Sequence, residues 1–177
     1  MINTIVFYFF KKRQVWLLLM TSALILESIA LYIQHITLLK PCVLCIYQRC
    51  ALFGIILTGL FIIMTPSYAI FRIIGLLTWI YSAWQGLFLA KKQNDIHLHP
   101  SPFTTCDLFV QFPTWLPLDT WIPSIFYAYG DCTENKWFFL TLDMSQWMII
   151  IFFIYLIIPT IPLILYIIHI LSKDKLK

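Results

Sequence analysis

Four long apolar blocks constrain the fold of this chain more than any other feature. They cover about residues 15–33, 43–64, 70–90 and 146–170. A helix rises about 1.5 Å per residue, so roughly 20 apolar residues cross a hydrocarbon core of about 30 Å. Backbone polar groups have no water partner in lipid, and blocks this continuous lack the alternation of a barrel strand. The sequence therefore predicts an all-α membrane protein, built as a four-transmembrane-helix bundle.

The composition leaves no room for a separate soluble domain. The chain is 61% hydrophobic and 11% charged, whereas soluble domains carry about 25% charged residues. We expect one membrane domain over residues 1–177, with loops at about 34–42 and 91–145. The basic residues before the first block are similar to the start of a signal peptide, but no small-x-small cleavage site follows. We therefore predict an uncleaved first helix.

The placement of lysine and arginine predicts the orientation. Four helices put both termini on one side, which carries Lys11, Lys12, Arg13, Arg72, Lys173, Lys175 and Lys177. The opposite side carries Lys40, Lys91, Lys92 and Lys136, with Arg49 just inside a helix. The positive-inside rule then favours cytoplasmic termini. Both the short loop and the long loop are predicted to face the outside.

Four cysteines fall on this outer side, where disulfides persist. They are Cys42, Cys45, Cys106 and Cys132. Four thiols allow three pairings, of which 42/45 with 106/132 is the economical one. A Cys-x-x-Cys closes too small a ring to stabilise a fold and commonly serves thiol exchange. For the loop pair, a purely structural disulfide is an equal alternative, and a Cys42–Cys132 bond stays open as an intermediate.

The residues around the first pair favour redox chemistry. Pro41 suits the first position of a helix, so Cys42 and Cys45 would lie in its opening turn, where the helix dipole stabilises a thiolate. Arg49 follows Cys45 by one helical turn and lies on the same face. An arginine inside a membrane segment usually marks a functional site. The alternative is an arginine that snorkels to the membrane surface.

Several motifs in this chain resemble one bacterial family. They are KPCVLCIYQRCALFG at residues 40–54, WIYSA in the third block, and PSPFTTCD and GDC in the long loop. Together they are similar to the disulfide bond formation protein B (DsbB) family, over nearly the whole chain. The resemblance implies an inner-membrane oxidoreductase with its loops in the periplasm. Such an enzyme reoxidises a periplasmic thioredoxin-fold dithiol oxidase (DsbA) and passes the electrons to a membrane quinone, either ubiquinone or menaquinone.

The same resemblance implies a role for each site residue. Cys106 would form the mixed disulfide with the DsbA-like partner, and Cys132 would be its mate in the loop. Cys132 would then exchange with Cys42, which leaves Cys45 as the thiolate that faces the quinone. Arg49 would polarise the quinone oxygen. The implied partners are the thiol oxidase, the quinone pool and membrane lipid, and no nucleic acid.

Two positions depart from the family pattern. Gln48 stands where the family often has glutamate, and we attach little functional weight to it. A family histidine near the quinone aligns with Gln93, while His97 and His99 are shifted from that position. We transfer the role to neither histidine, so any assistance to the quinone would have to come from elsewhere.

Other polar or aromatic residues are predicted to be structural. Cys50 lies inside the second block as an inert thiol. Glu27 is a functional candidate because it lies inside a membrane segment, but a hydrogen bond to a neighbouring helix is favoured. The aromatic, proline-broken stretch 109–126 cannot span the membrane. It either rests on the bilayer surface through Trp115, Trp121 and Phe126 or packs on the rim of the bundle.

Two other functions compete with thiol oxidation. A vitamin K epoxide reductase-like enzyme would also combine four helices, a Cys-x-x-Cys and a quinone. A metal-binding or transport protein would use Cys42, Cys45 and a histidine as ligands, although the histidines show no regular ligand spacing.

Overall fold

The computed structural model describes residues 12–64, 68–99, 107, 109–130, 132 and 138–174. Within them, four helices are long and apolar enough to cross a membrane. They are α2 (Arg13–Ile36), α3 (Val43–Met64), α4 (Ala69–Leu98) and α7 (Met144–Asp174). The predicted fold class, a bundle of four apolar helices, is confirmed.

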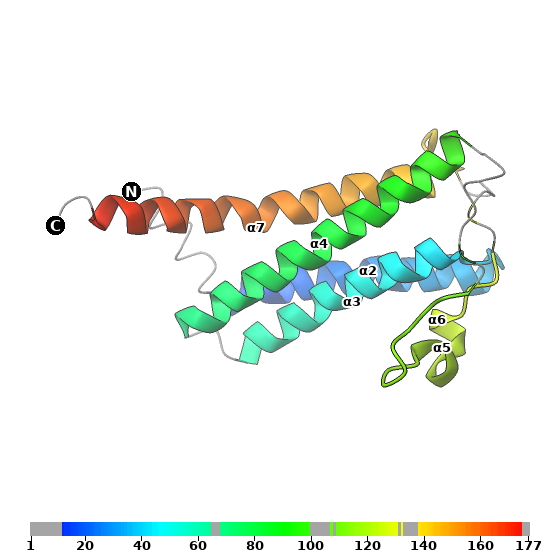
Figure 1. The fold of residues 1–177 in the computed structure, drawn as a ribbon, viewed down its shortest axis with the longest axis horizontal. Coiled ribbons are helices and arrows are strands. Elements are labelled where there is room, and N and C mark those ends of the chain that lie inside the picture. The colour runs from blue at the N-terminus through cyan, green and yellow to red at the C-terminus, as the bar shows by residue number, and fades with distance from the viewer. Residues whose placement is uncertain are drawn as a thin grey trace.

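The four helices pack in sequence order, and a side-chain hydrogen bond joins the first of them to the last. α2 lies against α3, α3 against α4, and α4 against α7. The Ser22 hydroxyl lies 2.8 Å from the Tyr155 hydroxyl, and this hydrogen bond joins α2 to α7. Figure 1 shows the start of α2 and the end of α7 at one end of the bundle. The short helices of the long loop, α5 and α6, lie at the opposite end.

The interior of the bundle is aromatic and aliphatic. Trp16 and Trp79 meet edge to face with their ring centroids 6.0 Å apart, and Ile55 and Phe152 are fully buried beside them. The outward faces are also apolar, with exposed side chains such as that of Leu57. A large exposed apolar surface marks contact with a partner or a membrane. The bundle therefore has the surface that a lipid environment requires.

Helix α4 continues past the predicted end of its apolar block. The block ends at residue 90, whereas the helix runs to Leu98. Its last two turns are amphipathic: Gln93 and Ile96 are buried, while Lys92 is exposed. The helical pattern of buried and exposed residues therefore continues beyond the point at which the sequence becomes less apolar. This extension brings polar residues of the predicted loop to the inner face of the bundle.

The described part of the long loop contains only short elements. They are α5 (Leu118–Trp121), α6 (Pro123–Phe126) and an antiparallel hairpin of β1 (Phe138–Phe139) and β2 (Leu142–Asp143). Proline has no N–H to donate to a helix, which explains helices of a single turn.

The aromatic side chains of this loop divide into two groups. Trp115 and Trp121 are exposed, whereas Phe126 is buried and packs on Phe53 of α3 with ring centroids 5.6 Å apart. Phe126 thus follows the second alternative for this stretch, packing on the rim of the bundle. This contact holds α6 against the end of α3 that carries the Cys-x-x-Cys.

Candidate redox site

Cys42 and Cys45 form a disulfide at the start of α3. The helix begins at Val43, where the apolar block begins, so Pro41 is not its first residue and Cys42 is the residue that precedes it. The Cys42 carbonyl accepts a hydrogen bond from Ile46 N at 3.1 Å, and its sulfur accepts one from Cys45 N at 3.2 Å. Cys42 Sγ thus satisfies a backbone N–H of the first turn, where partial positive charge favours a thiolate.

The disulfide borders a cavity of about 230 Å³ between the long helices. Most of its walls are apolar, and they come from α2, α3, α4, α7 and the segment 39–42. The polar side chains that line it, apart from the two cysteines, are Glu27, Gln34, Lys40, Gln48, Arg49, Gln93, His97 and Trp147. An apolar cavity of about 150 Å³ binds benzene, so this one has room for a single substituted ring.

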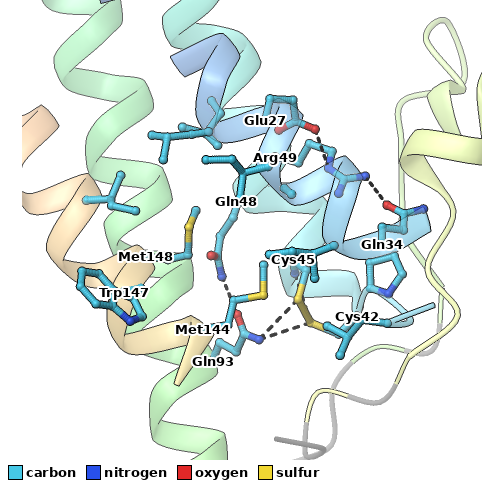
Figure 2. A pocket seen from close by; sticks show the side chains of 18 of the residues that line it. Glu27, Gln34, Cys42, Cys45, Gln48, Arg49, Gln93, Met144, Trp147 and Met148 are labelled. Atoms are coloured by element: carbon cyan, nitrogen blue, oxygen red, sulfur yellow. Dashed lines mark hydrogen bonds and ion pairs between the residues drawn. A yellow bond between two sulfur atoms is a disulfide. The ribbon is translucent and has the colours of Figure 1, made fainter. Parts of the chain in front are cut away.

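Arg49 lies in the cavity wall, where it forms an ion pair that sequence reasoning did not find. Its Nε atom lies 2.8 Å from Glu27 Oε1, and both side chains are almost fully buried (Figure 2). Its Nη1 atom donates to Gln34 Oε1 at 2.9 Å and to the Ile125 carbonyl oxygen. Nη2 has no partner among the described residues. The arginine is therefore held in place with one donor group uncommitted.

The Glu27–Arg49 pair corrects the expectation of a simple structural hydrogen bond for Glu27. The positions of the two residues along their helices could have indicated this contact. Glu27 lies nine residues before the end of α2 and Arg49 six residues after the start of α3. These separations correspond to depths of about 14 Å and about 9 Å from the same end. Two long side chains of opposite charge can bridge that difference.

Gln48 and Gln93 connect α3 to α4 beside the disulfide. Gln48 Nε2 donates to Gln93 Oε1 at 2.7 Å, and Gln93 Nε2 lies 3.5 Å from Cys42 Sγ and 3.4 Å from Cys45 Sγ. Both amides are buried. The first bond orients the second amide so that its NH₂ group faces both sulfurs (Figure 2). Gln48 thus belongs to the polar network beside the disulfide, a contact that the sequence did not indicate.

The long loop is attached directly above the disulfide. The backbone N–H groups of Tyr129 and Gly130 donate to the Pro41 carbonyl oxygen at 3.0 and 2.9 Å. These bonds explain why Pro41 lies outside the helix. Two residues further on, Cys132 is 1% exposed and belongs to the same buried cluster as Cys42. Cys132 is itself disulfide-bonded, whereas Cys106 lies outside the described residues.

Three residues near the redox pair, two histidines and the fifth cysteine, lie in different surroundings. His97 lines the cavity, while His99 is exposed at the end of α4. Cys50 is a free, half-buried thiol and is not among the residues that line the cavity.

Comparison with known proteins decides the class of this site. The family model for "Disulfide bond formation protein DsbB" matches residues 12–161. The chain is 61% identical over 148 residues to disulfide bond formation protein B of Blochmanniella pennsylvanica, and the match covers 84% of each chain. It is 56% identical over 153 residues to the protein of the same name from Sodalis glossinidius, covering 86% of each. The chain belongs to the DsbB family.

Membership of the DsbB family confirms the resemblance seen in the sequence. The chain is therefore a disulfide-forming oxidoreductase of the membrane. The match to the DsbB family argues against the alternative of a vitamin K epoxide reductase-like enzyme, because it covers the helices and the cysteine motif together. The metal-binding alternative gains no support, since no three His, Cys, Asp or Glu side chains among the described residues converge on one point.

Proposed function

We propose that this protein reoxidises the dithiol of a periplasmic, thioredoxin-fold oxidase of the DsbA type and passes the electrons to a membrane quinone. One observation carries the proposal: the Cys42–Cys45 disulfide lies in the wall of an apolar cavity that also contains a buried arginine. Such a cavity suits a quinone ring, and the disulfide is the group that would exchange electrons with it. Ubiquinone and menaquinone both satisfy this chemistry.

The first half of the reaction is thiol–disulfide exchange. A thiolate of the partner attacks Cys106 Sγ, the Cys106–Cys132 bond breaks, and Cys132 leaves as a thiolate. The second partner thiol resolves the mixed disulfide, which leaves the partner oxidised and both loop cysteines reduced. Cys132 then attacks Cys42 Sγ and releases Cys45 as a thiolate. Attack of Cys106 on Cys132 restores the loop disulfide and releases Cys42.

The second half of the reaction takes place at the cavity. Gln93 Nε2, within 3.5 Å of both sulfurs, stabilises the Cys45 thiolate by hydrogen bonding. Arg49 Nη2 would donate to an oxygen of a quinone ring held in the cavity. Oxidation of the Cys42/Cys45 dithiol supplies two electrons and two protons, which is what conversion of a quinone to a hydroquinone takes.

We further propose that both termini are cytoplasmic and that the loops bearing the cysteines face the periplasm. The lysine and arginine distribution supports this orientation. Periplasmic disulfides persist, as a disulfide relay requires. A membrane-impermeant thiol reagent applied to reduced, inside-out vesicles should not label Cys106, and rapid labelling there would contradict the orientation.

A reconstituted assay tests the whole proposal. Purified protein in detergent, mixed with a reduced thioredoxin-fold oxidase and a short-chain ubiquinone, should oxidise one partner dithiol for each quinone reduced. Partner thiols are counted by alkylation and quinone by its ultraviolet absorbance. The Cys50→Ser variant is the matched control and should behave like the unsubstituted protein. Partner oxidation without quinone loss would contradict the proposal.

Replacing Gly130 with alanine should slow transfer between the two cysteine pairs. A Cβ atom at Gly130 would lie 2.3 Å from the Lys40 carbonyl oxygen, so the loop must move away from Pro41. We expect turnover with the partner to fall about tenfold, equivalent to loss of roughly one hydrogen bond of about 1.4 kcal/mol. Reoxidation of chemically reduced Cys42/Cys45 by quinone should not change. Unchanged partner turnover would show that this attachment does not limit transfer.

A further inference from the structure

His97 lies in a small polar cluster at the end of α4 next to the cavity. Its Nδ1 atom lies 3.6 Å from Asp143 Oδ2 and 3.4 Å from Ser145 Oγ. Ser145 Oγ in turn donates to Asp143 Oδ1 at 2.7 Å. The His97 side chain is only 4% exposed. Its other ring nitrogen, Nε2, is buried and has no hydrogen-bond partner among the described residues.

The unpartnered nitrogen belongs to a side chain that lines the cavity. Nδ1 and Nε2 are separated by one ring carbon, and Asp143 and Ser145 contact Nδ1. His97 lines the cavity together with Gln93 and Trp147, whereas Asp143 and Ser145 do not line it. Of the two ring nitrogens, Nε2 is therefore the one left for a ligand in the cavity. A buried polar atom without a partner is costly, and a ligand in the cavity would remove that cost.

We propose that His97 is a catalytic residue of the quinone reaction, in which its Nε2 atom hydrogen-bonds a ring oxygen and exchanges a proton with it. This inference rests on the proposed function. His97 follows Gln93 by one helical turn on α4, whereas Arg49 projects from α3 toward Glu27 of α2. The two donors thus reach the cavity from different helices. A quinone has two oxygens on opposite edges of its ring, and each donor would serve one of them.

The position of Asp143 allows His97 to carry the proton. In the protonated imidazole, Nδ1–H faces Asp143 and Nε2–H is available to a carbonyl oxygen. After the proton has passed to that oxygen, neutral Nε2 accepts a hydrogen bond from the new hydroxyl group. His97 then regains one of the two protons released when the Cys42/Cys45 dithiol becomes a disulfide. The overall reaction is the same as without His97: two electrons and two protons leave the dithiol and are taken up by the acceptor.

A merely structural His97 would tie α4 to the start of α7 through Asp143 and would not contact the quinone. Infrared difference spectroscopy separates the two roles. The probe is a short-chain ubiquinone labelled with ¹³C at one carbonyl carbon at a time and bound to the full-length protein. A hydrogen bond lowers the stretching frequency of the carbonyl that accepts it. The His97→Phe variant keeps a ring but has no nitrogen, and His99→Phe is the matched control at an exposed position.

We expect one carbonyl band to return to its unbound frequency in His97→Phe, with kcat about 100-fold lower, as for loss of a general acid. His99→Phe should change neither. His97→Gln, whose amide donates but does not titrate, should keep the shifted band and still lose the rate. The His97→Gln variant also tests the role of His97 if the His97→Phe variant does not fold.

Unchanged carbonyl bands and kcat in His97→Phe, or full kcat in His97→Gln, would overturn the role of His97. Failure of the unsubstituted protein to bind the labelled quinone is a distinguishable result. It would overturn the proposed function itself, and the role of His97 with it.

Discussion

The Cys106→Ser variant should lose turnover with its dithiol partner and still exchange electrons with quinone. Cys132, the other loop cysteine, is 1% exposed, so a partner thiolate has no access to it. Thiol exchange requires that access. The Cys42–Cys45 pair lies in the cavity wall, and its oxidation by quinone does not involve Cys106.

Two measurements on the same preparation test this separation. The first follows partner thiols under turnover, and its rate should fall to the uncatalysed background. The second reduces Cys42 and Cys45 chemically, adds a short-chain ubiquinone, and counts remaining thiols by alkylation and mass spectrometry. Cys50→Ser serves as the control for substitution of a cysteine outside the cavity lining. Turnover of Cys106→Ser at the rate of the unsubstituted protein would remove Cys106 from its proposed role.

The Arg49→Ala variant should raise the KM for quinone about 10- to 150-fold. A hydrogen bond from a charged group contributes about 1.5–3 kcal/mol, and loss of ligand binding appears in KM. The same substitution leaves Glu27 buried without its ion-pair partner. Breaking a buried pair in this way costs about 3–5 kcal/mol of stability. A change in KM alone would therefore not distinguish lost binding from damage to the fold.

A neutral pair of substitutions separates these two effects. The double variant Glu27→Gln with Arg49→Met removes both charges and keeps the side-chain volume, so it should recover most of the thermal stability lost in Arg49→Ala. Its KM for quinone should stay raised, because the donor is still missing. Glu27→Gln alone keeps Arg49 and should change KM only a few-fold. If the double variant regained the original KM, Arg49 would serve only to neutralise Glu27.

The class of this fold could be read directly from the sequence, because it depends on the length of apolar runs. A block of about 20 apolar residues has few alternatives to a spanning helix. Helix ends were less predictable. Gln93 and His97 follow the apolar block, yet they lie on α4, since the buried face of the helix continues after its lipid-facing residues end.

The chemistry of the first cysteine pair was also local enough to predict. Cys42, Cys45 and Arg49 lie within eight residues of one another, and helical spacing alone brings them to one face. The motif was thus sufficient to indicate a disulfide-exchange protein. Nothing in it could show which residues of other helices complete the site.

Contacts between distant residues were decided only by packing. Gln48 reaches Gln93 on another helix, His97 faces Asp143, and Pro41 accepts hydrogen bonds from the loop at Gly130. Each contact depends on how far one helix slides and rotates against its neighbour. Apolar helix surfaces that can pack in several registers do not specify that choice locally. The amino-acid order thus determined four helices and a reactive cysteine pair, whereas the bundle's packing determined the polar groups that surround it.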